Sequence, residues 1–177
     1  MIRSDALNRQ YKLGKYAPEG RPAAVARTGG AASGRLRRMS PDSIAAPMDH
    51  EKHIEIRWRD VDSYLHVNNA VYATYLEEGR DEWLESTLGD VGSSWDYVLA
   101  RVAIDFRREL RLEDEAVVVS CRIERIGNSS LTLKEQIRTR DGELAAESEA
   151  VLVARAKDTG RSRPLSELER ETFERAL

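Results

Sequence analysis

The chain has 177 residues, of which 28 are lysine or arginine and 31 are aspartate or glutamate, and its formal net charge at pH 7 is −3. With 41% apolar residues it can bury one core, and its length suits one ordinary domain plus a tail. It contains no run of about eighteen apolar residues, so the sequence excludes a transmembrane helix and we expect no membrane partner. Its single cysteine, Cys121, excludes an intramolecular disulfide, and we expect a cytoplasmic location.

The charge is divided unevenly along the chain. Residues 1–47 hold nine Lys and Arg against three Asp and Glu, whereas residues 48–177 hold 19 against 28. The first segment is rich in Gly, Ala, Arg and Ser without apolar periodicity, so we expect a disordered basic tail. Three interpretations of it stay open: a start assigned too far upstream, with Met48 or Met39 as the true start, a transit segment, or an arm that touches nucleic acid or membrane. Because the remaining chain is acidic and repels phosphates, we expect no nucleic-acid partner.

The folded part begins with a predicted strand and a long helix. In the segment HIEIRW, residues 53–58, apolar side chains alternate with polar ones, which indicates a short half-buried strand. After a polar turn, Asn68 or Asn69 can cap a helix that runs to about Leu88, with Gly89 as its stop. One face of this helix carries an apolar stripe, Tyr72, Leu76, Gly79 and Trp83. We expect this face to be buried, and its glycine to mark the close approach of another backbone.

Four long alternating segments follow the helix and predict strands. The first covers residues 97–108 and the second residues 115–126. Each places apolar side chains on one face, namely Val102, Ile104 and Phe106, and then Val117, Val119, Cys121 and Ile123. The next two segments form a hairpin through Asp141 and Gly142, which is a strong two-residue turn signal. Residues 164–177 predict a short C-terminal helix.

This order of elements predicts an α+β domain over residues 48–163. Its single long helix is the natural cover for the apolar face of a five-stranded antiparallel sheet. One helix cannot cover all the apolar surface of five strands, so we expect a homo-oligomer, either a homodimer or a homotetramer.

A long motif joins the polar turn to the helix. In RWRDVDSYLHVNNAVYATYLEEGR, residues 57–80, it consists of Arg57, Trp58, Asp60, Asp62, His66, Val67, Asn68, Asn69, Tyr72, Tyr75, Glu77 and Arg80. This pattern resembles that of the hotdog-fold acyl-CoA thioesterases, specifically the 4-hydroxybenzoyl-CoA thioesterase-like family, and the resemblance spans residues 51–160. It implies a hotdog fold, in which a five-stranded antiparallel sheet wraps around one long central helix.

The resemblance also implies a chemistry for the turn. Asp62 would attack the thioester carbonyl or activate water to attack it, and the backbone N–H of Asn69 would polarise the carbonyl oxygen. Asp60 would support the turn, and neither a metal nor another cofactor is implied. Without the family, an Asx turn or a helix cap is the simpler interpretation of Asp62.

Further residues are candidates for substrate contacts. His66 is interpreted as a scaffold or pocket wall, with a role as general base as the alternative, and Asn68 as a capping and orienting group. Ser129 and Ser130 lie where members of the family pass near the pantetheine arm, although an ordinary polar turn explains them equally well. The candidates for the phosphates of CoA are the cations that follow the last strand, Arg155, Lys157, Arg161 and Arg163.

The expected function is hydrolysis of an acyl-CoA thioester. Two alternatives stay open: a thioesterase acting on acyl groups of acyl carrier protein, and a hotdog protein that binds acyl-CoA without turning it over. One departure bears on them, because the family usually has glycine before the histidine and this chain has Leu65. If the backbone there needs a positive φ, leucine is strained by about 1 kcal/mol or more, so either the turn is rebuilt or the position tolerates a side chain.

Overall fold

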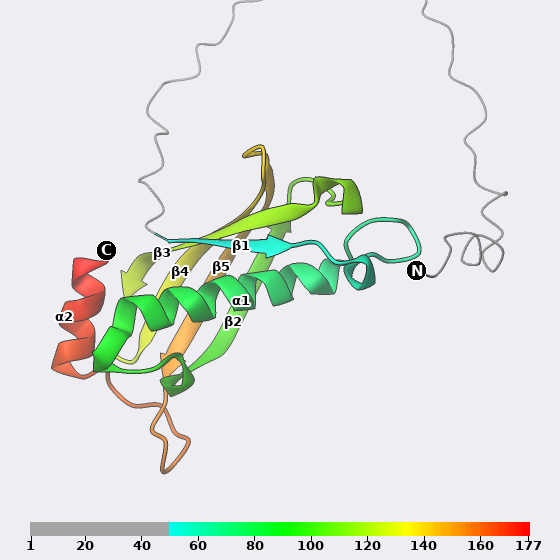
Figure 1. Ribbon diagram of the computed structural model, residues 1–177. Helices are drawn as coiled ribbons and strands as arrows, with labels where there is room; N and C mark the ends of the chain where they lie inside the picture. The colour runs from blue at the N-terminus through cyan, green and yellow to red at the C-terminus, as the bar shows by residue number, and fades with distance from the viewer. Residues whose placement is uncertain (1–49) are drawn as a thin grey trace, which may run out of the picture. The chain divides into compact units, whose positions relative to one another are not determined.

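The computed structural model describes residues 50–177, and Figure 1 shows how their elements are arranged. The expectations for residues 1–47, and for Met48 as a start, concern residues outside this part. In chain order the strands and helices are β1 (Glu51–Glu55), α1 (Asn69–Leu88), β2 (Tyr97–Phe106), β3 (Ala116–Ile126), β4 (Ser130–Thr139), β5 (Leu144–Ala154) and α2 (Glu167–Arg175). Neither α1 nor α2 is long and apolar enough to cross a membrane.

The five strands form one antiparallel sheet in the order β1-β3-β4-β5-β2. α1 lies across one face of this sheet, as Figure 1 shows. The central strands β3 and β4 bury the side chains that face α1: Val117, Val119, Cys121, Ile123, Leu131, Leu133 and Ile137. This arrangement is the hotdog fold, and it confirms the predicted α+β class with its five-stranded sheet and single long helix.

Both ends of α1 carry residues that suit their backbone geometry. Asn68 caps the start, because its side-chain oxygen accepts a hydrogen bond from the Ala70 N–H at 2.9 Å. Gly89 follows the last turn with a φ of +51°, and its N–H donates to the Glu85 carbonyl. Of the two predicted caps, Asn68 is the one used, and Asn69 becomes the first helical residue.

Gly79 marks the place where α1 comes closest to the sheet. A Cβ atom at this position would lie 2.4 Å from Cγ1 of Val119 on β3, so any other residue would force that side chain to move. The predicted close approach is therefore present, but its partner is a valine side chain and not another backbone.

A buried ion pair joins α1 to β4. Arg80 Nε donates to Oε1 of Glu135 at 2.7 Å, and Nη2 donates to Oε2 at 3.3 Å. On β4, Glu135 stands between Leu133, which belongs to one apolar cluster of the core, and Ile137, which belongs to the other. Because each charge is desolvated, the pair is stable only in this geometry, so it defines how α1 sits on the sheet.

Cys121 is buried in the middle of β3. Burial raises the pKa of its thiol far above the ordinary range, and the nearby Glu135 carboxylate raises it further. The thiol therefore stays protonated at physiological pH and acts as a packing group.

β2 forms one edge of the sheet and is only partly covered by the chain itself. Its pairing with β5 places Val102, Ile104 and Phe106 opposite buried residues, which confirms the shared face predicted for them. Phe106 nevertheless remains 50% exposed, and Leu99 and Val102 are exposed as well. A long edge strand with exposed apolar side chains is a surface that proteins normally cover.

Candidate active site

The segment between β1 and α1 folds back on itself before the helix begins. Trp58–Asp60 forms a 3₁₀ turn, after which Val61 and Val67 pair as an isolated antiparallel bridge. Inside this loop the Asp62 N–H donates to the carbonyl of His66 at 2.9 Å. The loop therefore holds Asp62 and His66 next to each other, immediately before the first turn of α1.

Asp60 is buried and anchors this loop. Its Oδ2 accepts hydrogen bonds from the Arg57 N–H at 2.8 Å, from Arg57 Nε at 3.1 Å and from the Tyr75 hydroxyl at 2.9 Å. Its backbone carbonyl accepts the Asn68 N–H at 2.9 Å. Burial raises the pKa of the Asp60 carboxyl, but the hydrogen bonds from Arg57 and Tyr75 outweigh burial and hold the pKa below its usual value. These contacts fit the supporting role predicted for Asp60.

Asp62 lines a cavity of about 440 Å³. Its Oδ1 accepts the Tyr64 N–H at 2.8 Å, which is the Asx turn that the residues alone favoured. Its other carboxylate oxygen has no hydrogen-bond partner within residues 50–177. Because the Asx turn occupies only one oxygen, it leaves the second oxygen free for chemistry.

The first amides of α1 reach the same cavity through Asn69, which also lines it. The Ala70 N–H is bound by the Asn68 side chain, and the Val71 N–H donates to the Asn68 carbonyl at 2.8 Å. The Asn69 N–H has no acceptor within the described part of the chain. It is thus a free donor at the positive end of a 20-residue helix.

The cavity wall comes from the loop, from α1 and from the segment that follows β2. The lining residues are Asp62, His66, Val67, Asn69, Tyr72, Phe106, Arg107, Arg108 and Glu109. The Tyr72 hydroxyl donates to the Arg108 carbonyl at 3.1 Å and accepts the Leu110 N–H at 3.0 Å. Tyr72 therefore fixes the segment after β2 against the start of α1.

His66 contacts a residue that the sequence did not indicate. Its Nε2 lies 3.0 Å from Oε2 of Glu109, and the Arg111 side chain binds the other oxygen of that carboxylate at 2.5 Å. Glu109 lies 43 positions after His66, and no local pattern connects the two. The contact arises because the Val67 N–H donates to the Leu110 carbonyl at 2.8 Å, a pairing that only the folded chain reveals.

Leu65 adopts the left-handed conformation that the family's glycine would favour. Its φ is +65°, its side chain is 68% exposed, and its N–H donates to the Asp62 carbonyl at 3.0 Å. Of the two alternatives, the structure favours the second: the position accepts a side chain that stays in solvent. Leucine in this conformation costs on the order of 1 kcal/mol or more.

The structure places the remaining predicted residues elsewhere. Ser129 lies in the turn between β3 and β4, and Ser130 is the first residue of β4. Both lie beside the end of β5, where the Ala154 N–H donates to the Ser129 carbonyl at 2.9 Å. The other predicted cations lie in the segment after β5, residues 155–163, called the basic loop here: Arg155, Lys157, Arg161 and Arg163. Of these, Arg163 binds both oxygens of Glu169 on α2 at 2.7 Å and is already neutralised.

The basic loop and the Asp62 cavity lie at opposite ends of α1. Figure 1 shows the basic loop, in orange, near the end of the helix and away from its start. The 20 residues of α1 span about 30 Å at about 1.5 Å per residue. A single chain therefore brings Asp62, His66, Asn68 and Asn69 together, but it does not bring the basic loop or Ser129 and Ser130 to them.

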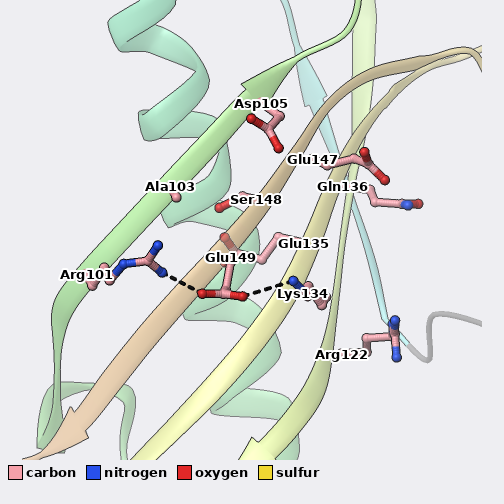
Figure 2. A pocket seen from close by; sticks show the side chains of 10 residues that line it. All are labelled: Arg101, Ala103, Asp105, Arg122, Lys134, Glu135, Gln136, Glu147, Ser148 and Glu149. Carbon is pink, nitrogen blue, oxygen red and sulfur yellow. Dashed lines mark hydrogen bonds and ion pairs between the residues drawn. The ribbon is translucent and has the colours of Figure 1, made fainter.

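A second cavity of about 440 Å³ lies on the sheet, and Figure 2 shows its lining. Three of its charges pair with one another: Glu149 accepts hydrogen bonds from Arg101 at 2.5 Å and from Lys134 at 3.0 Å. None of the residues expected to act on a substrate lines it. We therefore take the cavity at Asp62 as the candidate active site. Within residues 50–177, no cluster of three or more His, Cys, Asp or Glu is placed to hold a metal ion.

The fold is that of a hotdog protein, and the comparisons with known proteins give its class. The family model described as the thioesterase-like superfamily matches residues 56–173, which is most of the described chain. The chain therefore belongs to the thioesterase-like superfamily.

Solved structures agree with this assignment. The chain is similar to a thioesterase from Thermus thermophilus complexed with coenzyme A and Zn, with 32% identity and a TM-score of 0.65 over 72% of this chain and 92% of that one. A predicted thioesterase from Bacillus stearothermophilus is 29% identical, with a TM-score of 0.65 over 72% and 96% of the two chains. These matches place the chain among thioester hydrolases.

One curated relative comes from a plant. An acyl-acyl carrier protein thioesterase, chloroplastic, from Arabidopsis thaliana is 36% identical over 73 residues. The match covers 39% of this chain and 38% of that enzyme, so it spans less than half the length of either.

We expect Asp60→Asn to lower the free energy of unfolding by about 2 kcal/mol at pH 7, because the ionised acceptor of three hydrogen bonds is lost. The folded pKa of Asp60 lies below the unfolded value of about 3.9. Its stabilisation is therefore present above about pH 4 and is lost as the pH falls through the folded pKa. The free energies of unfolding of the wild type and of Asp60→Asn should therefore become equal at low pH. Urea unfolding between pH 7 and about pH 2.5 measures this difference. The exposed Asp141→Asn is the control, and a difference that does not change with pH would contradict the account.

Replacement of Leu65 by glycine should stabilise the protein by about 1 kcal/mol, because glycine adopts a positive φ without strain. The neighbouring Tyr64 is also exposed but has no positive φ, so Tyr64→Gly serves as the matched control and should destabilise. Urea unfolding of both variants tests this. If both changes destabilise equally, the strain assigned to Leu65 is absent.

Proposed function

We propose that the protein hydrolyses the thioester of an acyl-CoA, with Asp62 as the nucleophile or general base. The observation that carries this proposal is the meeting of two groups at one cavity. Asp62 offers a carboxylate oxygen without a hydrogen-bond partner in the described chain, and Asn69 offers a free backbone N–H. A thioester carbonyl that lies between them meets a base or nucleophile and a donor for its oxygen.

The two roles of Asp62 differ in their first step. As a nucleophile, the carboxylate attacks the carbonyl carbon, the carbon–sulfur bond breaks, and water then cleaves the resulting anhydride. As a general base, it takes a proton from a water molecule that attacks the carbonyl itself. Both routes consume one water and release a free acid and a free thiol. In both, negative charge on the carbonyl oxygen is stabilised by the Asn69 N–H and the helix dipole.

The neighbours of these two groups hold them in place. Asn68 caps α1 and binds the Ala70 N–H, which leaves the N–H of Asn69, a residue that lines the cavity, as the free donor. His66 forms a wall of the cavity and is oriented by Glu109. We therefore assign Asn68 and His66 to the positioning of the loop and of the substrate.

We further propose that two chains pair through β2. This edge strand exposes Leu99, Val102 and Phe106, and a partner strand would cover them. In an antiparallel pair, the end of one β2 lies beside the start of the other. Phe106 at the end of β2 lines the Asp62 cavity, and Asp96 just before its start binds the basic loop.

This pairing would remove the separation found within one chain. The basic loop of the partner, with its Ser129 and Ser130, would approach the Asp62 cavity across the shared strands. An acyl-CoA could then place its thioester at Asp62 of one chain and its phosphates on the other chain, where arginine and lysine are suitable donors. The active unit of this proposal is therefore at least a homodimer.

The first experiment tests the chemistry. A panel of short, medium, long and aromatic acyl-CoAs is assayed for release of free thiol with the wild-type protein and with Asp62→Asn. We expect Asp62→Asn to lower kcat by about 100-fold or more, because the base or nucleophile is lost. Asp141→Asn, in an exposed turn, is the charge-matched control and should leave turnover unchanged. Turnover that survives Asp62→Asn would refute the proposed mechanism.

Light scattering tests the pairing. The wild-type protein should have the mass of a dimer or a larger assembly, and Val102→Glu should shift it towards the monomer, because it buries a charge in the β2 contact. The turnover of Val102→Glu should fall by about tenfold or more, because each chain in the monomer lacks the basic loop of its partner. Leu168→Glu on α2, at another exposed leucine, should change neither property. A monomeric wild type with full activity would contradict the pairing.

The same assays also test the two alternative functions. The match to the plant enzyme supports acyl carrier protein as an alternative carrier of the acyl group. The same acyl group should therefore be offered on CoA and on carrier protein. Binding of acyl-CoA without turnover on any member of the panel would favour a non-catalytic role. The cytoplasmic location expected from the single cysteine stays a prediction.

A further inference from the structure

Trp95 is a large apolar side chain that the fold leaves in solvent. It lies in the 3₁₀ turn Ser94–Asp96, between α1 and β2, and is 86% exposed. The turn itself is tightly held, because Glu85 Oε1 on α1 accepts the Ser94 N–H at 2.8 Å and the Ser94 hydroxyl at 2.5 Å. An indole that is held on an ordered turn and left outside the core is available to contact another molecule.

The basic loop contacts the same turn. The Asp96 carbonyl, next to Trp95, accepts the Arg155 N–H at 2.7 Å, and Asp96 Oδ1 lies 3.1 Å from Lys157 Nζ. The Ala156 N–H donates to the Arg161 carbonyl at 2.8 Å, which closes the loop on itself. Trp95, Arg155, Lys157 and Arg161 thus belong to one corner of the molecule.

This corner has free positive charge in a domain that is acidic overall. Neither the Arg155 nor the Arg161 side chain forms an ion pair with any residue in the described part of the chain, and both residues are exposed. Lys157 pairs only with Asp96 and keeps 73% of its side chain in solvent. Cations on an exposed rim beside a flat aromatic face are the combination that binds nucleotides, because phosphates need donors and a base needs a surface on which to stack.

We propose that Trp95 is the platform on which the adenine ring of CoA stacks, with Arg155, Lys157 and Arg161 binding its phosphates. This inference rests on the proposed function and names the carrier of the acyl group. CoA has an adenine and several phosphates, whereas the arm of acyl carrier protein has one phosphodiester and no base. An exposed indole therefore favours CoA as the substrate.

Isothermal titration calorimetry tests the platform without any turnover. The probes are free CoA, adenosine 3′,5′-bisphosphate and pantetheine, which has no nucleotide. Trp95→Ala should weaken the binding of CoA and of the bisphosphate about tenfold, which is the size of one stacking contact, and leave pantetheine unchanged. Trp95→Phe should restore affinity to within about threefold, because it keeps an aromatic face.

Leu168→Ala provides the control. Leu168 is 53% exposed, but it lies on α2, outside both the Trp95 turn and the basic loop, so its removal should not change the affinity for the bisphosphate. Lys157→Ala should weaken the bisphosphate and reduce the salt dependence of its binding, because a phosphate contact is lost.

Several results would overturn the proposal. The platform is refuted if Trp95→Ala binds CoA as tightly as the wild type, or if the bisphosphate does not bind at all. A change in the mass of the assembly on Trp95→Ala would identify Trp95 as a subunit contact instead. An equal fall in turnover for CoA and carrier-protein substrates would point to protein docking. Because calorimetry needs no hydrolysis, these results stay separate from those of Asp62→Asn.

Discussion

The buried carboxylate of Asp60 is the contact on which the candidate site depends. Through its side chain it joins Arg57, after β1, to Tyr75 on α1, and through its carbonyl it holds the N–H of Asn68. Strand, loop and helix start are therefore tied to one residue, which ensures that Asp62 and the Asn69 N–H reach the same cavity. The Arg80–Glu135 pair does the same for the middle of α1, where it joins the helix to β4. Both carboxylates are buried, and both can hold the helix in place because hydrogen bonds from neighbouring side chains compensate their burial.

Much of this fold could be predicted from local patterns. Alternation predicted the strands because the sheet has one face on the helix, and the Asp141-Gly142 pair predicted the hairpin between β4 and β5 because few residues adopt that turn. The bounds of α1 followed from Asn68 and Gly89, whose backbone roles are strictly local. The motif around Asp62 predicted that its loop and the helix start would meet, since they are neighbours in the chain.

Contacts between distant segments could not be predicted in this way. Glu135 interrupts an apolar strand face, whereas Arg80 lies outside the apolar stripe expected for the helix and is nevertheless buried. Neither pattern indicates the other residue as its partner. His66 and Glu109 meet because Val67 and Tyr72 hold the segment after β2 against the start of α1. The separation of the basic loop from the Asp62 cavity could not be predicted either. The length of α1 lies between them, and residue types alone carry no information on that distance.

The burial of Cys121 has a consequence for a catalyst of this kind. Each turnover of a thioester releases a thiol, and air or cellular oxidants convert part of any thiol pool to disulfides. A protein thiolate within reach of those disulfides would exchange with them and become covalently capped. The chain's only cysteine lies under α1 with its pKa raised, so it offers neither the access nor the thiolate that exchange requires. The protein would therefore not form mixed disulfides with the oxidised form of the thiol that it would release.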